Sequence, residues 1–166
     1  MSGNLTVDIL FVCTANRFRS VVAEGYFRFL CENAVPPIQV SIGSAGTWAV
    51  AGFPPVSEAA QFAREHGFLV DNIRSKEIDK ELIENSRLVI AMASGHKESI
   101  LLEYPWASHK VFQISQICRN QTFDVPDLGD NEGESATELL LEICGLLDEG
   151  FEKICNILSI AKKEQK

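Results

Sequence analysis

Short apolar or alternating runs are interleaved with longer stretches in which apolar residues recur every three or four positions. The short runs predict strands of a parallel sheet at residues 9–12, 38–42, 87–92 and 110–114. The longer stretches predict helices at residues 20–33, 57–65, 95–103 and from 136 onward, with a helical turn at 82–85. Residues 43–47, Gly-Ser-Ala-Gly-Thr, are interpreted as a glycine-rich turn. Alternating strands and helices predict a three-layer α/β/α fold, a four-stranded parallel sheet with helices on both faces.

Composition narrows the class of protein. A length of 166 residues predicts one domain over residues 1–166, and 46% hydrophobic with 23% charged residues is ordinary for a globular protein. The net charge of −8 argues against nucleic acid or an anionic membrane as a partner. No leader-like segment and no run of about 18 apolar residues is present, which favours a cytoplasmic location. The five cysteines form no CxxC pair and no zinc spacing with histidine, so neither metal nor cofactor is expected.

The segment between the first predicted strand and the first predicted helix carries the clearest chemistry. It begins at Cys13 and ends at Arg19 and Ser20. A strand–loop–helix turn leaves backbone N–H groups and a helix N-terminus facing one point, which favours a doubly negative oxyanion such as phosphate. These dipoles, with Arg17 and Arg19, favour the thiolate of Cys13 over the thiol. Arg19 can bind two phosphate oxygens at once, and Ser20 can donate its hydroxyl to the sulfur.

Cys13, five intervening residues, Arg19 and Ser20 resemble the loop of the low-molecular-weight protein tyrosine phosphatase family, usually Cys-x-Gly-Asn-x-Cys-Arg-Ser-Pro. Asn16 also matches. Ser44-Ala45-Gly46-Thr47 resembles what the family carries after its second strand, and this match is independent of the first. The resemblance implies the strand order 2-1-3-4 and metal-free hydrolysis of phosphomonoesters through a phosphocysteine.

The resemblance also implies roles for individual residues. Cys13 would be the nucleophile, and Arg19 would hold the phosphoryl group together with the loop residues Thr14, Ala15, Asn16, Arg17, Phe18 and Ser20. Ser44 would brace the loop through Asn16. Trp48, in the irregular loop that follows, would form an apolar wall for an aromatic leaving group; ordinary packing against the sheet is the alternative for this side chain.

A polar loop at residues 124–130 matches the family's acid loop by position. The resemblance makes Asp127 the general acid, which must be protonated when the phosphoryl group leaves. Leu128 stands where the family usually has proline, so Asp124 and Asp130 remain alternatives. His96, in the first turn of a predicted helix, is expected at the surface rather than in the site.

Several positions depart from the family pattern. Ala15 replaces glycine, Phe18 the second cysteine and Val21 the proline of the loop, while Ile73 and Ala93 replace a histidine and an aspartate. Arg17 occupies a position where phosphotyrosine-specific members carry an aliphatic residue and arginine phosphatases carry threonine. The departures therefore leave the substrate open.

The function predicted best is a low-molecular-weight protein tyrosine phosphatase acting on phosphotyrosine-containing proteins, in opposition to a cognate bacterial tyrosine kinase. Two alternatives remain, a protein arginine phosphatase and a catalytically impaired phosphate-binding module of the same fold. Arsenate reductases share the first loop but need two further cysteines in the middle of the chain. No cysteine lies between Cys31 and Cys118, which disfavours that reading.

Overall fold

The computed structural model describes residues 6–164. Four strands, β1 (Val7–Cys13), β2 (Ile42–Gly46), β3 (Ser86–Ala91) and β4 (Val111–Gln113), form one parallel sheet in the order β2-β1-β3-β4. This is the predicted order. The helices are α1 (Arg19–Asn33), α2 (Ser57–Glu65), α3 (Lys80–Asn85), α4 (Ser94–Glu103), α5 (Ile114–Arg119) and α6 (Ala136–Glu164), with a 3-10 turn at Pro105–Ala107.

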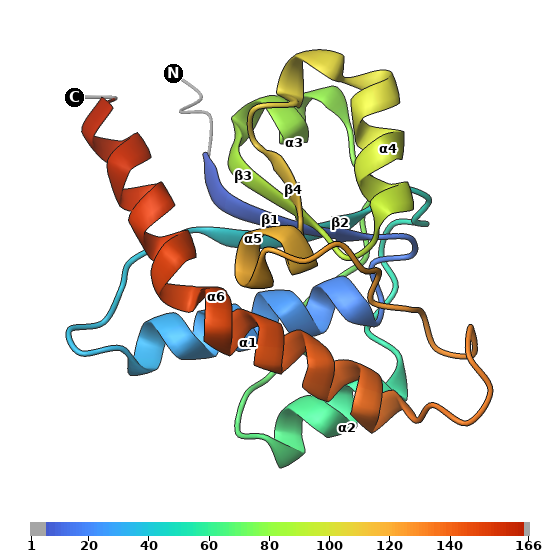
Figure 1. Ribbon diagram of the computed structural model, residues 1–166. Helices are drawn as coiled ribbons and strands as arrows, with labels where there is room; N and C mark the ends of the chain where they lie inside the picture. The colour runs from blue at the N-terminus through green and yellow to red at the C-terminus, as the bar shows by residue number, and fades with distance from the viewer. Residues whose placement is uncertain (1–5, 165–166) are drawn as a thin grey trace.

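Helices cover both faces of the sheet, as predicted (Figure 1). Side chains alternate along β1: Ile9 and Phe11 join the core beneath α1, α2, α5 and α6, whereas Leu10 and Val12 join a smaller core beneath α3 and α4. Because both faces of β1 are buried, its sequence is apolar from Ile9 to Cys13 rather than alternating. Cys13 continues the Ile9–Phe11 row, so the last residue of the strand faces the side of α1.

The second strand was predicted in the wrong place. The structure places it at Ile42–Gly46, over the stretch interpreted as a turn, and residues 38–41 lie outside the strand. Ile38 and Val40 do pack against the core, which explains the alternation there. A Cβ on Gly46 would collide with the carbonyl oxygen of Thr14, so this glycine lets β2 lie directly against the first loop.

Helix α5 was also missed, because its start at Ile114 was assigned to the fourth strand. Ile114 and Ile117 are both buried and are spaced for one face of a helix. The helix stops at Asn120, which adopts a left-handed conformation with φ 53°. Within residues 6–164, no helix is long and apolar enough to cross a membrane.

Candidate active site

The loop between β1 and α1 lies at the carboxyl ends of the strands. Its carbonyl groups are held from outside: Thr47 N–H donates to Cys13 O at 2.9 Å, Trp48 N–H to Thr14 O at 3.0 Å, and Val56 N–H to Arg17 O at 2.9 Å. In a trans peptide the N–H points opposite to the carbonyl. Each outward carbonyl therefore turns the next N–H toward the centre of the loop, where an anion would bind.

Asn16 holds this loop in shape. It is completely buried and left-handed, with φ 56°, a conformation that asparagine tolerates better than most residues. Its amide nitrogen donates to Ser20 Oγ and to Ser44 Oγ, both at 2.9 Å, and its oxygen accepts from Lys76 N–H at 3.1 Å. The contact with Ser44 is the one that the resemblance implied. The side chain of Ile73 has no group that could hydrogen-bond to Asn16. The backbone N–H of Lys76 makes a supporting contact with Asn16 instead.

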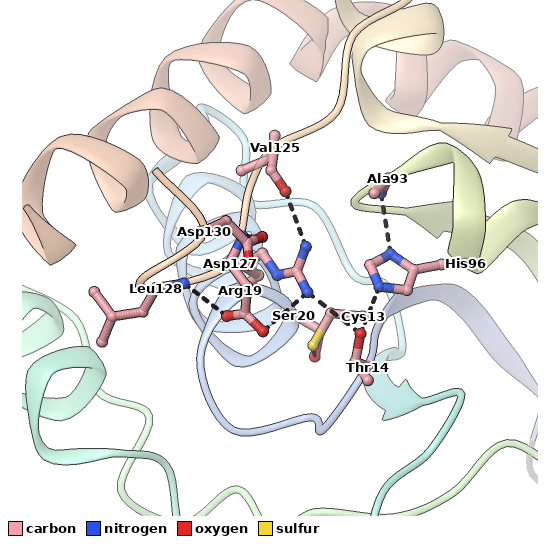
Figure 2. A network of polar contacts seen from close by, with 10 residues as sticks. All are labelled: Cys13, Thr14, Arg19, Ser20, Ala93, His96, Val125, Asp127, Leu128 and Asp130. Carbon is pink, nitrogen blue, oxygen red and sulfur yellow. Dashed lines mark hydrogen bonds and ion pairs between the residues drawn. The ribbon is translucent and has the colours of Figure 1, made fainter. Parts of the chain in front are cut away.

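Cys13 lies at the base of the loop and is 3% exposed. Its sulfur is 2.9 Å from the hydroxyl oxygen of Ser20, at the first turn of α1 (Figure 2). Since Ser20 accepts a hydrogen bond from Asn16, its own O–H proton is free to be donated to the sulfur. The structure thus provides a stabilising donor for a thiolate at Cys13.

Arg19 lies across the loop from this sulfur and is 5% exposed. One terminal nitrogen donates to Val125 O at 2.9 Å, and the other lies 3.4 Å from Thr14 Oγ1 and 3.2 Å from a carboxylate oxygen of Asp127 (Figure 2). The guanidinium is therefore fixed between the first loop and the loop at residues 124–130. The N–H of Val125 itself donates to the carbonyl oxygen of Met92, the residue directly after β3, at 3.0 Å.

The three candidate aspartates occupy different places. Asp127 reaches Arg19, and its side chain is 42% exposed at the mouth of the loop. Asp124 accepts hydrogen bonds from Ser94 N–H at 2.8 Å and from the Gln113 amide at 2.7 Å, so it supports the start of α4. Asp130 accepts from Asp127 N–H at 2.7 Å and so fixes the backbone of the acid loop.

His96 was expected at the surface, and this expectation was wrong. The residue is 7% exposed, and its Nε2 lies 2.9 Å from Thr14 Oγ1 while its Nδ1 accepts from Ala93 N–H at 3.1 Å (Figure 2). Burial, with a further contribution from the charge of Arg19, lowers the pKa of His96 to about 4. Its place as the third residue of α4, three after Ala93, is the one sequence signal, because a polar side chain there can bind the N–H that precedes a helix.

This histidine should make the protein less stable in acid. The folded-state pKa lies below the unfolded value of 6.5, so the unfolded chain binds the proton first and stability falls as the pH drops from 6.5 toward 4. The total effect is about 3 kcal/mol in the free energy of unfolding. Urea unfolding at several pH values should show a smaller acid loss for His96→Gln than for wild type, and equal losses would contradict the assignment. The charges of Asp127 and Asp124 raise the pKa of His96 and so oppose the effect of burial. Both aspartates are therefore kept in the two proteins that are compared.

The rim of the site carries Arg17 and exposed aromatic side chains. Arg17 Nε donates to Pro54 O at 2.9 Å, and its guanidinium lies 5.3 Å from the centre of the Phe53 ring. Phe53 is 47% exposed and Trp48 is 82% exposed, so the Trp48 ring lies largely in solvent rather than against the loop. Two further loop residues expected at the phosphate have side chains in other surroundings: Ala15 is exposed, and the Phe18 side chain is buried in the core, so any contact of theirs with phosphate stays a prediction for their backbone N–H groups.

The comparisons with known proteins agree with this geometry. The family described as "Low molecular weight phosphotyrosine protein phosphatase" matches residues 8–166. The protein-arginine-phosphatase of Geobacillus stearothermophilus is 36% identical over 119 residues, covering 72% of this chain and 76% of that protein. A low molecular weight protein tyrosine phosphatase from T. tengcongensis superposes with a TM-score of 0.80 at 34% identity, covering 89% of this chain and 99% of that one.

A second similar structure bears on the cysteine. It is a cysteine-to-serine mutant of the YwlE arginine phosphatase with a phosphorylated active-site serine, and it matches with a TM-score of 0.80 at 27% identity, covering 89% of this chain and 95% of that one. The loop, the fold and these relatives lead to one conclusion. The chain belongs to the low-molecular-weight phosphotyrosine protein phosphatase family and is a phosphatase, a hydrolase.

Proposed function

We propose that this phosphatase hydrolyses phosphomonoesters on proteins in two in-line steps through a phosphocysteine at Cys13. The proposal rests on two contacts around one loop whose N–H groups point inward. The Cys13 sulfur contacts the Ser20 hydroxyl, and the Arg19 guanidinium contacts the Asp127 carboxylate. Nucleophile, anion-binding groups and an acid are the parts that metal-free phosphoryl transfer requires.

In the first step the Cys13 thiolate attacks phosphorus. Arg19 and the loop N–H groups hold the equatorial oxygens, and protonated Asp127 gives its proton to the departing oxygen. The phosphoryl group competes with Asp127 for Arg19, which releases the carboxyl toward the leaving group. In the second step the same carboxylate takes a proton from water as it attacks the phosphocysteine. Ser20 stabilises the sulfur as attacking and as leaving group.

The direct test is hydrolysis of p-nitrophenyl phosphate with a chelator and a reductant present. The proposal predicts turnover that the chelator leaves unchanged and that vanadate inhibits competitively. An inactive but folded protein that still binds inorganic phosphate would contradict it and would favour the phosphate-binding module.

We propose phosphotyrosine as the physiological substrate. Arg17 and the exposed rings of Phe53 and Trp48 support this choice, because they offer an apolar and cationic rim to a neutral aromatic leaving group. The similarity to a protein-arginine-phosphatase favours phosphoarginine as the second candidate. Its guanidinium leaving group carries a positive charge, which Arg17 would repel. Action against a cognate tyrosine kinase and a cytoplasmic location stay predictions.

Arg17→Thr should shift substrate choice toward phosphoarginine. Removing one like charge from the rim of the site is worth about 1 kcal/mol, so the ratio of kcat/KM for phosphoarginine over phosphotyrosine peptides should rise about five- to tenfold. Arg17→Lys is the matched control, since it keeps the charge and should keep the ratio. An unchanged ratio in Arg17→Thr would remove Arg17 from the basis of selectivity.

A further inference from the structure

The hydroxyl of Thr14 lies between two nitrogen donors. His96 Nε2 is 2.9 Å from Thr14 Oγ1 on one side, and the Arg19 nitrogen that also contacts Asp127 is 3.4 Å away on the other (Figure 2). Thr14 is half-buried and directly follows Cys13 at the mouth of the loop. A polar side chain of the site thus lies beside the groups that would handle the phosphoryl and leaving oxygens.

The surroundings of His96 fix which of its nitrogens carries the proton. Ala93 N–H is a backbone donor aimed at Nδ1, so Nδ1 must accept, and the hydrogen of the neutral ring is on Nε2. Nε2–H then donates to Thr14 Oγ1, and Arg19, which is only a donor, also approaches the same oxygen. With its oxygen accepting from both sides, the Thr14 O–H proton must point elsewhere. That proton is then available to a phosphoryl oxygen bound in the loop.

We propose that Thr14 is a further substrate-binding residue whose hydroxyl donates a hydrogen bond to the phosphoryl group, and that His96 is the positioning residue that orients it. The proposal rests on the phosphatase mechanism above and adds a side-chain donor to Arg19 and the loop N–H groups. Because the donated hydrogen bond is placed for the planar equatorial oxygens of the in-line transition state, its loss should lower kcat more than it raises KM.

The neutral ring is essential to this arrangement. A protonated His96 would bear a hydrogen on Nδ1 that faces Ala93 N–H, donor against donor, and would break the contact that orients the ring. The low pKa caused by burial and by Arg19 keeps the ring neutral across the working range, with Asp124 and Asp127 as the opposing charges nearby. The imidazole therefore transfers no proton in the reaction.

A double-mutant cycle on p-nitrophenyl phosphate tests the pair. Thr14→Val, which keeps the shape and removes the hydroxyl, should lower kcat roughly 10- to 100-fold, the value of one hydrogen bond to a charged group. Thr14→Ser should stay within a few-fold of wild type. His96→Phe should lower kcat comparably in the wild-type background but cause little further loss in Thr14→Val, because its effect passes through the hydroxyl. His96→Gln, whose amide can accept from Ala93 and donate to Thr14, should recover most of the activity.

Losses that multiply in the double mutant would overturn the proposal, because a purely structural role for His96 acts whether or not the hydroxyl is present. Full activity of Thr14→Val would overturn it as well. His109→Phe on the exposed His109 is the matched control and should leave kcat unchanged. If His96→Phe does not fold, two results still test the proposal. The value of kcat should fall in Thr14→Val but not in Thr14→Ser, and kcat of His96→Gln should stay close to that of wild type. Cys13→Ser, assayed in parallel, separates the two proposals, since activity that survives it would refute the mechanism itself.

Discussion

Replacing Cys13 by serine is expected to reduce hydrolysis of p-nitrophenyl phosphate by on the order of 10⁴-fold or more, as losing a nucleophile does in other enzymes. Serine is nearly the same size, and its hydroxyl stays protonated in the place where the thiolate attacks. The residues that hold the anion remain, so inorganic phosphate should bind within a few-fold of wild type. Steady-state kinetics and calorimetric titration with phosphate measure the two quantities on the same preparation.

Cys155→Ser is the matched control for this change. Cys155 is a half-buried residue on α6 with its sulfur near Cys31, away from the loop. Its replacement should leave kcat and KM unchanged. Turnover by Cys13→Ser close to that of wild type would mean that the phosphoryl group is attacked by another group, and no other part of the mechanism would then hold.

Asp127→Asn is expected to lower kcat for phenyl phosphate on the order of 10²- to 10⁴-fold, the usual contribution of a general acid. An amide of the same shape cannot protonate the phenolate that leaves. The deficit should shrink for leaving groups of increasing acidity, because a stable anion departs without a proton. The measurement is a plot of log kcat/KM, which reports only the steps up to formation of the phosphocysteine, against leaving-group acidity; it should be steep for the variant and flat for wild type.

The neighbouring aspartates supply the controls. Asp124 is bound to Ser94 and Gln113, and Asp130 to the backbone of Asp127, so their asparagine variants should lose only a few-fold and show the flat leaving-group dependence of wild type. A steep dependence in Asp124→Asn or Asp130→Asn, with a flat one in Asp127→Asn, would move the acid to that residue.

Much of the site was predictable because its chemistry is local in the sequence. The strand, loop and first helix are continuous, so the spacing from Cys13 to Ser20 already predicts that Cys13, Arg19 and Ser20 lie around one loop. The sheet order was predicted from the family resemblance, and the structure confirms it. The contact between Asn16 and Ser44 followed from the same resemblance and is present at 2.9 Å.

The features that were missed depend on contacts between distant segments. The position of β2 is set by the close approach of Gly46 to Thr14, and an alternating pattern that begins four residues before β2 gave a stronger local signal. His96 is 82 positions from Thr14, so its burial against the loop could not be predicted from helical spacing alone. Ile73 cannot hydrogen-bond to Asn16, and the backbone N–H of Lys76 binds Asn16 instead. A pattern of side chains in the sequence does not reveal such a backbone contact.

The most direct test of the mechanism is to look for phosphate bound to the sulfur of Cys13 during turnover. Wild type and Asp127→Asn are mixed with p-nitrophenyl phosphate, denatured at neutral pH, and analysed by phosphorus NMR and by mass spectrometry of proteolytic fragments. The mechanism predicts a phosphocysteine at Cys13 that accumulates in Asp127→Asn, because the missing carboxylate also activates the water of the second step. Sustained turnover with no phosphate on Cys13 in either protein would contradict it.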